Sequence, residues 1–301
     1  MSEKKNSLEY IDISRPAGGR SSRRQAEAVG RGAGQSRRRR KSSKDRFFTA
    51  GTVLCIVIVG ILALILFTPL REGMEGFFRK DSGEEDAAAA FLNDQSTKAD
   101  YPQELRELVE INPEALDFVW DYPNREQYQG KPIDLSGDYT SGQVPLLMQW
   151  DKRWGYDSYG DSNIGLAGCG PTCMAMIYLY LTGDTSANPR TMAEFADDNG
   201  YHTADGTAWS FWTDGAAQLG LDGEALSLSE SAMKGVLDSG GLIVCSMRPG
   251  DFTTTGHFIV IRGYDKNGFY VNDPNHRSTS EKQWSFKQLS GQIKNLWGIT
   301  G

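Results

Sequence analysis

Cys169 lies at a position where a cysteine can act as a nucleophile, at the start of a predicted helix. In the segment GLAGCGPTCMAMIYLYLTG, residues 165–183, Cys169 has a glycine on each side and precedes a run of apolar residues. The run is apolar on nearly all sides, as in a buried helix, and Pro171 suits the first turn of that helix. A thiol at a helix N-terminus lies near the positive end of the helix dipole, which favours the thiolate. For an isolated cysteine, an inert packing thiol would be the preferred interpretation.

A base and an acid follow further along the chain. The segment GHFIVIRGYDKNGFYVNDPNH, residues 256–276, predicts a β-hairpin with His257 at its start and Asp273 at its end. Two antiparallel strands bring these residues to the same open end, as neighbours, so that imidazole and carboxylate can meet. A base oriented by an acid, with a separate thiol on a helix terminus, is the arrangement that nucleophilic catalysis requires. Taken alone, His257 would be interpreted as a structural histidine at a strand start.

Together these segments resemble the papain-like cysteine peptidases related to the bacteriocin-leader, or double-glycine, processing peptidases. The resemblance runs from about Val144 to Ile299, and its motifs occur in the family's order. The motifs are VPLLMQWDKRWG (144–155), AGCGPTCMAM (167–176), TADGTAWSFW (203–212), GHFIVIRGYD (256–265) and FYVNDP (269–274).

The resemblance implies a role for four residues. Cys169 is the expected nucleophile, His257 the base, and Asp273 the residue that orients the base. Gln149 is the expected donor of a hydrogen bond to the oxyanion. The implied reaction is attack of the Cys169 thiolate on a peptide carbonyl, through an acyl-enzyme.

The resemblance also implies a fold and a cleft. We expect an α+β, papain-like fold in which the Cys-bearing helix packs on an antiparallel sheet. Its strands are predicted near residues 242–248, 257–263, 268–273 and around 295–299. Further candidates for the substrate cleft are Gly168, Gly170 and Trp209. No cofactor and no metal are expected.

The other cysteines and histidines are interpreted as structural. No second Cys/His pair accompanies Cys169 and Cys173, as a zinc site would need. A disulfide between Cys173 and Cys245 is not required by the sequence. The aromatic loop with Trp209, Phe211 and Trp212 either roofs the cleft or packs in the core. Cys55, within the predicted span, is interpreted as lipid-facing or packing, and the residues interpreted as packing or loop residues are Cys173, Cys245, His202 and His276.

Residues 71–143 are expected to form a stalk that precedes the peptidase domain, 144–301. Up to residue 100 the chain has Gly, acidic residues and no sustained apolar face. The segments PQELRELVEI and PEALDFVWDYP each begin with Pro and space apolar residues along one face, which predicts helices over about 102–111 and 113–121. Pro123 is expected to end the second helix, and a connector follows. Docking on the main domain and recruitment of substrate are the two interpretations of these helices.

A membrane span is predicted near the N-terminus. Residues 47–70, FFTAGTVLCIVIVGILALILFTPL, hold no charged residue and no histidine. A helix of this length reaches about 36 Å, enough to cross a hydrocarbon core of about 30 Å. Residues 1–46 carry 14 basic and 5 acidic side chains, and the rest of the chain is acidic. We therefore expect a disordered cytoplasmic tail, a single span in the cell membrane, and an extracytoplasmic peptidase domain.

These observations lead to a membrane-anchored cysteine peptidase acting on peptides or envelope proteins outside the cytoplasm. Membrane lipid is an expected partner through residues 47–70 and the basic tail, and nucleic acid is not. Leader-processing peptidases act on the cytoplasmic side, so their double-glycine substrate is not carried over. Two alternatives remain: a catalytically silent domain that binds a peptide or a cell-wall component, and an amidase or acyl transferase on the same scaffold.

Overall fold

The computed structural model describes residues 83–94, 96 and 100–301. All of these belong to the second of the two units into which the chain divides, Thr68–Gly301. The predicted tail, residues 1–46, and the predicted span, residues 47–70, lie outside the described residues. Within the described part, no helix combines the length and the apolar character that a membrane crossing needs.

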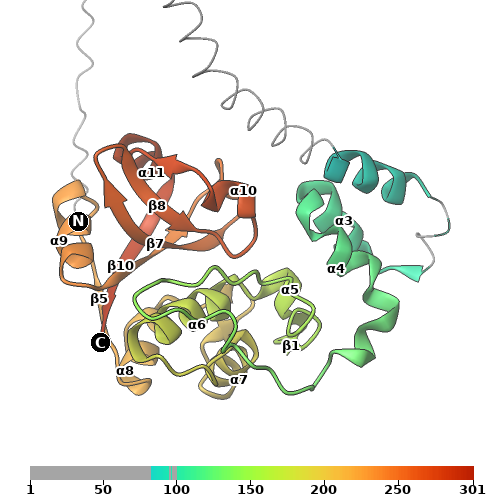
Figure 1. Ribbon diagram of the computed structural model, residues 1–301, viewed down its shortest axis with the longest axis horizontal. Coiled ribbons are helices and arrows are strands. Elements are labelled where there is room, and N and C mark those ends of the chain that lie inside the picture. Colours follow the sequence, from blue (N-terminus) through green and yellow to red (C-terminus); the bar gives the residue numbers. More distant parts are fainter. Residues whose placement is uncertain (1–82, 95, 97–99) are drawn as a thin grey trace, which may run out of the picture. The chain divides into compact units, whose positions relative to one another are not determined.

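The largest sheet of the described unit is six-stranded and antiparallel (Figure 1). Its strand order is β5-β10-β6-β7-β8-β9. The strands are β5 (Asp222–Ala225), β6 (Leu242–Met247), β7 (His257–Asp265), β8 (Gly268–Asn272), β9 (Gln283–Trp284) and β10 (Ile293–Thr300). The four expected strands are the four inner ones. The edge strands β5 and β9 were not predicted, because neither contains a run of β-branched residues.

Both faces of this sheet are covered by packed side chains, so the sequences of its inner strands contain continuous apolar runs. Every residue of β6 is buried. Leu242 and Val244 pack into the core that contains α6 (Cys169–Thr182), while Ile243 and Cys245 pack into a second core on the opposite face. This alternation is the period of two of a β-strand. The second core is closed by α9 (Glu230–Asp238) and α11 (Phe286–Gln292).

The predicted Cys-bearing helix is α6, and its apolar character has a direct structural cause. Nine of its 14 residues are buried between the sheet and α7 (Pro189–Asp198). Gly183 ends the helix in the left-handed region, with φ at 72°, and donates its N–H to the carbonyl of Leu179. Glycine adopts this conformation at little steric cost.

The remaining elements are short and connect the helices to the sheet. The helical ones are α5 (Ile164–Ala167), η3 (Trp209–Trp212), α8 (Asp214–Gln218) and α10 (Arg277–Ser280). Two small hairpins are formed by β1 (Ser158–Tyr159) with β2 (Ser162–Asn163), and by β3 (His202–Thr203) with β4 (Gly206–Thr207).

The part of the predicted stalk that follows residue 102 is helical and packs onto the domain. We call residues 103–127 the helical segment; it comprises α3 (Gln103–Ile111), η1 (Pro113–Ala115), α4 (Leu116–Trp120) and η2 (Tyr122–Gln127). Pro123 ends α4 as expected, but it also lies in the first turn of η2, where the absence of an N–H costs nothing. The expected connector therefore begins only after Gln127, where η2 ends.

A further difference lies N-terminal to this segment. Residues 83–93 are helical, whereas the sequence predicted no order before Tyr101. Ala88 and Phe91 are buried, and the Phe91 ring centre lies 5.0 Å from that of Tyr101 and 5.7 Å from that of Trp120. One aromatic residue and a run of alanines are too few to show an amphipathic pattern. The apolar surface that they cover is supplied by Tyr101, Trp120 and other residues outside this helix.

Substitution of Phe118 tests how much the packing of the helical segment on the domain contributes to stability. The Phe118 side chain is 1% exposed and its ring stacks on that of Tyr156, with the centres 4.4 Å apart. Phe118→Ala should lower the free energy of unfolding by about 3–5 kcal/mol, because the substitution leaves a cavity between the segment and the domain. Urea unfolding of the full-length chain, followed by tryptophan fluorescence, would measure this change.

Ile111→Ala is the matched control, since the Ile111 side chain is 58% exposed. It should change the free energy of unfolding by less than about 0.5 kcal/mol. Equal effects of the two substitutions would contradict the docking of the segment on the domain.

Candidate active site

Cys169 occupies the first position of α6, and it is the accessible thiol among the cysteines of residues 83–94, 96 and 100–301. Its side chain is partly exposed, whereas Cys173 and Cys245 are fully buried. Burial raises the pKa of both buried thiols, so they remain protonated and unreactive at neutral pH. Cys173 donates a hydrogen bond to the carbonyl of Phe258 at 3.4 Å, which ties α6 to β7.

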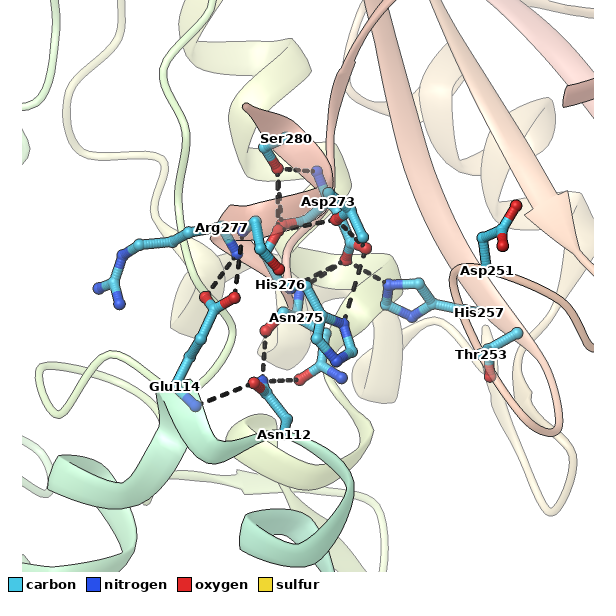
Figure 2. Close-up of polar contacts among 12 residues, drawn as sticks. Asn112, Glu114, Asp251, Thr253, His257, Asp273, Asn275, His276, Arg277 and Ser280 are labelled. Atoms are coloured by element: carbon cyan, nitrogen blue, oxygen red, sulfur yellow. Dashed lines mark hydrogen bonds and ion pairs between the residues drawn. The ribbon is translucent and has the colours of Figure 1, made fainter. Parts of the chain in front are cut away.

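His257 begins β7, and its side chain points to Asp273 (Figure 2). The Nε2 atom of His257 lies 2.7 Å from Oδ1 of Asp273, and both residues are buried. This contact occupies Nε2 and leaves Nδ1 as the ring nitrogen available to Cys169. Cys169 and His257 line the same cleft, and the Cys169 side chain contributes to raising the pKa of the imidazole. The structure thus brings together three of the four residues to which the resemblance assigned roles.

The hairpin ladder alone does not place His257 opposite Asp273. Val260 pairs with Asn272, and the same register continued would put His257 opposite Asn275. The contact forms because β8 ends at Asn272 and the chain turns at Asp273. Oδ1 of Asp273 accepts hydrogen bonds from the backbone N–H groups of Asn275 and His276, at 2.8 and 3.2 Å. This turn folds the carboxylate back toward the imidazole.

Two hydroxyl groups hold the other side of the Asp273 residue. Thr279 donates from Oγ1 to Oδ2 of Asp273 at 2.7 Å, and the Asp273 N–H donates to Oγ of Ser280 at 2.8 Å. Sequence analysis did not single out these residues. A Thr-Ser pair in a polar loop carries no signal of its own, because only the turn after β8 brings α10 back to the carboxylate.

The charges of the pair stabilise one another. Burial alone would lower the pKa of His257, but the charge of Asp273 and its hydrogen bond, with a contribution from Cys169, raise that pKa well above its ordinary value. Burial alone would raise the pKa of Asp273, but the charge and hydrogen bond of His257 hold it below its usual range. At neutral pH the pair is therefore an imidazolium and a carboxylate.

Gln149, the fourth residue with an expected role, is held by hydrogen bonds from its side chain and from its backbone. Its Nε2 donates to the carbonyl of Gly165 at 2.9 Å, and its backbone N–H donates to the carbonyl of Pro274 at 2.7 Å. The side chain is 4% exposed, and its Oε1 accepts no hydrogen bond from the described residues. An amide nitrogen has two hydrogens, so Nε2 retains one donor for a group bound beside Cys169.

A cleft of about 1040 Å³ opens above these side chains. Cys169, His257 and Gln149 line it, and so does Trp209, whose side chain is 43% exposed. Lys294 lies over the Trp209 ring, with Nζ 5.2 Å from the ring centre. The aromatic loop is therefore divided, because Phe211 and Trp212 are fully buried in the core while Trp209 faces the cleft.

Gly168 and Gly170 do not line the cleft, in contrast to their expected place there. Both allow close packing instead. A Cβ on Gly168 would lie 2.6 Å from the carbonyl oxygen of Ile164, and one on Gly170 would lie 2.3 Å from Oγ1 of Thr207. Their absence of a side chain lets the backbone around Cys169 approach its neighbours.

The two loop histidines have different surroundings. His276 lines the cleft, and its Nδ1 lies 3.8 Å from Oδ2 of Asp273, so its interpretation as an ordinary loop residue overlooked a neighbour of the acid. His202 packs edge-on against Tyr159 and is not among the lining residues. The position of His276 three residues after Asp273 was the available signal.

Comparisons with known proteins concern the C-terminal half of the chain. The family model described as "Peptidase_C39 like family" matches residues 141–301, a range that includes all four residues with expected catalytic roles. A protein from Bacillus anthracis described as a C39-like peptidase is 16% identical, with 53% of this chain and 95% of that chain covered and a TM-score of 0.34. The peptidase domain of Streptococcus ComA, a bi-functional ABC transporter involved in a quorum sensing pathway, is also 16% identical. It covers 43% of this chain and 89% of its own, with a TM-score of 0.33. No curated protein matches the chain.

The pH dependence of thiol alkylation tests the electrostatics of the pair. Iodoacetate is an anion, so it should react fastest with Cys169 while His257 is protonated. Asp273→Asn removes the charge that raises the pKa of His257, and the alkaline limb of the profile should move to lower pH by about 1–3 units. The rate of alkylation across pH, with the adduct located by mass spectrometry, provides the measurement.

Asp251→Asn is the matched control. Asp251 lies in the loop between β6 and β7, is exposed, and accepts a hydrogen bond from Gln292 Nε2 at its carboxylate. Screening by water should leave the alkaline limb unchanged. An alkaline limb that stays in place in Asp273→Asn would refute the imidazolium–carboxylate pair.

Proposed function

The chain belongs to the Peptidase_C39 like family, and from this premise we propose that it is a cysteine peptidase that cleaves peptide bonds through Cys169, His257 and Asp273. The observation that carries the proposal is the buried 2.7 Å contact between His257 and Asp273, beside a partly exposed thiol at the start of α6. A base oriented by an acid and directed at a thiol is the geometry of a nucleophilic enzyme.

The first half of the proposed reaction forms an acyl-enzyme. The Cys169 thiolate attacks the carbonyl carbon, a C–S bond forms, and the carbonyl electron pair moves to oxygen. Gln149 Nε2 and backbone N–H groups at the start of α6 would bind this oxyanion. As the carbonyl re-forms, the C–N bond breaks, and the His257 imidazolium gives its Nδ1 proton to the leaving amine.

The second half releases the acid. Neutral His257 accepts a proton from water, whose oxygen attacks the thioester carbon. The C–S bond then breaks, which returns the thiolate and the imidazolium. Asp273 keeps its charge throughout and holds the imidazole by its Nε2 atom. No group other than the peptide and water is consumed.

The cleft suits an extended peptide. Its lining includes one face of α3, whose lining residues recur at the spacing of one helical stripe, and also a tryptophan and two basic residues from other elements. These lining residues are Glu104, Glu107, Leu108 and Ile111 on α3, and Trp209, Arg248 and Lys294 elsewhere in the chain. Side chains of either charge and apolar side chains would find complementary groups along this cleft.

We also propose that the chain is anchored in the cell membrane with the peptidase domain outside the cytoplasm. The support is sequence alone: the apolar stretch 47–70, its length, and the excess of basic residues before it. Under this proposal, the substrates are peptides or envelope proteins, and membrane lipid contacts the span and the basic tail.

Cleavage of a pooled peptide library by the full-length chain tests the activity, with products identified by mass spectrometry. Cys169→Ala should abolish cleavage. Gln149→Ala should reduce turnover by about 100–1000-fold, the usual cost of one oxyanion donor. Gln143→Ala, at an exposed position, is the matched control and should cleave at the wild-type rate.

The same experiment shows whether water or an amine accepts the acyl group from Cys169. Reaction in ¹⁸O-labelled water should place the label in the new carboxyl group. Amide products formed only when an amine is added would identify an acyl transferase instead. Peptides that bind without any product, together with slow alkylation of Cys169, would identify a binding domain.

A further inference from the structure

The helical segment, residues 103–127, contacts the loop that carries the acid. We call residues 273–278 the Asp273 loop. The segment precedes the range matched by the family model, 141–301, and the loop lies near the end of the chain. Figure 2 shows Asn112 and Glu114 reaching from the segment to the Asp273 loop.

Asn112 forms the first of these contacts. It is fully buried, and its Nδ2 donates to the carbonyl oxygen of Asn275 at 2.6 Å. Its Oδ1 accepts the N–H of Glu114 at 3.1 Å, so both ends of the amide are used. The same Asn275 carbonyl also accepts the Nε1–H of Trp150 at 2.7 Å. Asn275 in turn donates its N–H to Oδ1 of Asp273.

Glu114 forms the second contact. Its carboxylate accepts the backbone N–H of Arg277 at 2.7 Å and that of Ser278 at 3.1 Å. These two N–H groups are the first of α10 and lack carbonyl partners within the helix. A carboxylate at this end is also favoured by the helix dipole. The next two residues, Thr279 and Ser280, are those that bond to Asp273.

Both contacts therefore lead to the same carboxylate through residues that bond to it, Asn275 in one case and Thr279 of α10 in the other. Asn112 acts on the Oδ1 side through Asn275, and Glu114 acts on the Oδ2 side through α10. We infer that Asn112 and Glu114 are positioning residues, which hold Asp273 where it can orient His257. The inference rests on the proposed function for its catalytic meaning, but its test needs no substrate.

The pH profile of Cys169 alkylation by iodoacetate, in the full-length chain, separates positioning from simple support of the fold. Asn112→Ala and Glu114→Ala should each move the alkaline limb to lower pH by about 0.4–1 unit, the equivalent of one hydrogen bond. The shift has the direction expected for Asp273→Asn, because a displaced carboxylate stabilises the imidazolium less. Glu114 is only partly buried, so its substitution tests the inference even if Asn112→Ala fails to fold.

Two exposed residues of the same part of the chain serve as matched controls. Asn124 bonds only to Asp121 nearby, and Glu110 lies on the exposed side of α3. Asn124→Ala and Glu110→Ala should leave the profile unchanged. Urea unfolding of each variant shows whether a shift accompanies loss of the folded state.

The pH profiles either support or overturn the positioning role of Asn112 and Glu114. Profiles of Asn112→Ala and Glu114→Ala that coincide with wild type would overturn it, and so would a wild-type Cys169 that reacts like a free thiol, since no pair would then need positioning. Shifted limbs without any peptide cleavage by the wild-type chain would support it while refuting the proposed peptidase activity.

Discussion

The buried contact between His257 and Asp273 is the interaction on which the rest of the site depends. Burial disfavours both charges, so the pair is stable because each charge compensates the other and because further donors satisfy the carboxylate. Those donors are two backbone N–H groups and the hydroxyl of Thr279, all within the turn after β8 and the start of α10. The carboxylate organises the turn, and the turn in return places the carboxylate beside the imidazole.

Two cores hold the partners of this contact in place. His257 begins a strand in the middle of a sheet that is buried on both faces, and Cys169 begins a helix that is buried on most sides. Neither element can shift without opening a densely packed core, which would cost several kcal/mol. The thiol and the imidazole are thus set at the cleft by rigid elements, while residues from loops and from α3 form its walls.

The helical segment, which precedes the range matched by the family model, also supports the site. Its apolar residues form a third core with Met148 and Trp150, the two sequence neighbours of Gln149, and with Tyr156. Its polar residues reach the Asp273 loop. Docking on the domain was one of the two interpretations of these helices, and the structure shows it: the helical segment packs against the residues on either side of Gln149 and contacts the Asp273 loop.

The sequence by itself determined the elements with strong local patterns. The apolar run after Cys169, the β-branched runs of the inner strands and the helices near residues 102–121 could be predicted because short-range periodicity and Pro or Gly punctuation suffice for them. It also identified Cys169, His257, Asp273 and Gln149 as candidates. Tertiary structure alone decided how His257 reaches Asp273, because the turn after β8 and not the strand pairing makes the expected contact. It also decided the packing roles of Gly168 and Gly170 and the contacts of Asn112 and Glu114. The contact of His257 with Asp273 depends on a turn whose course is set by hydrogen bonds to one carboxylate. The contacts of Asn112 and Glu114 join residues 163 positions apart, and the glycines are needed because Ile164 and Thr207 approach them closely in the folded chain. No local sequence pattern records these relationships.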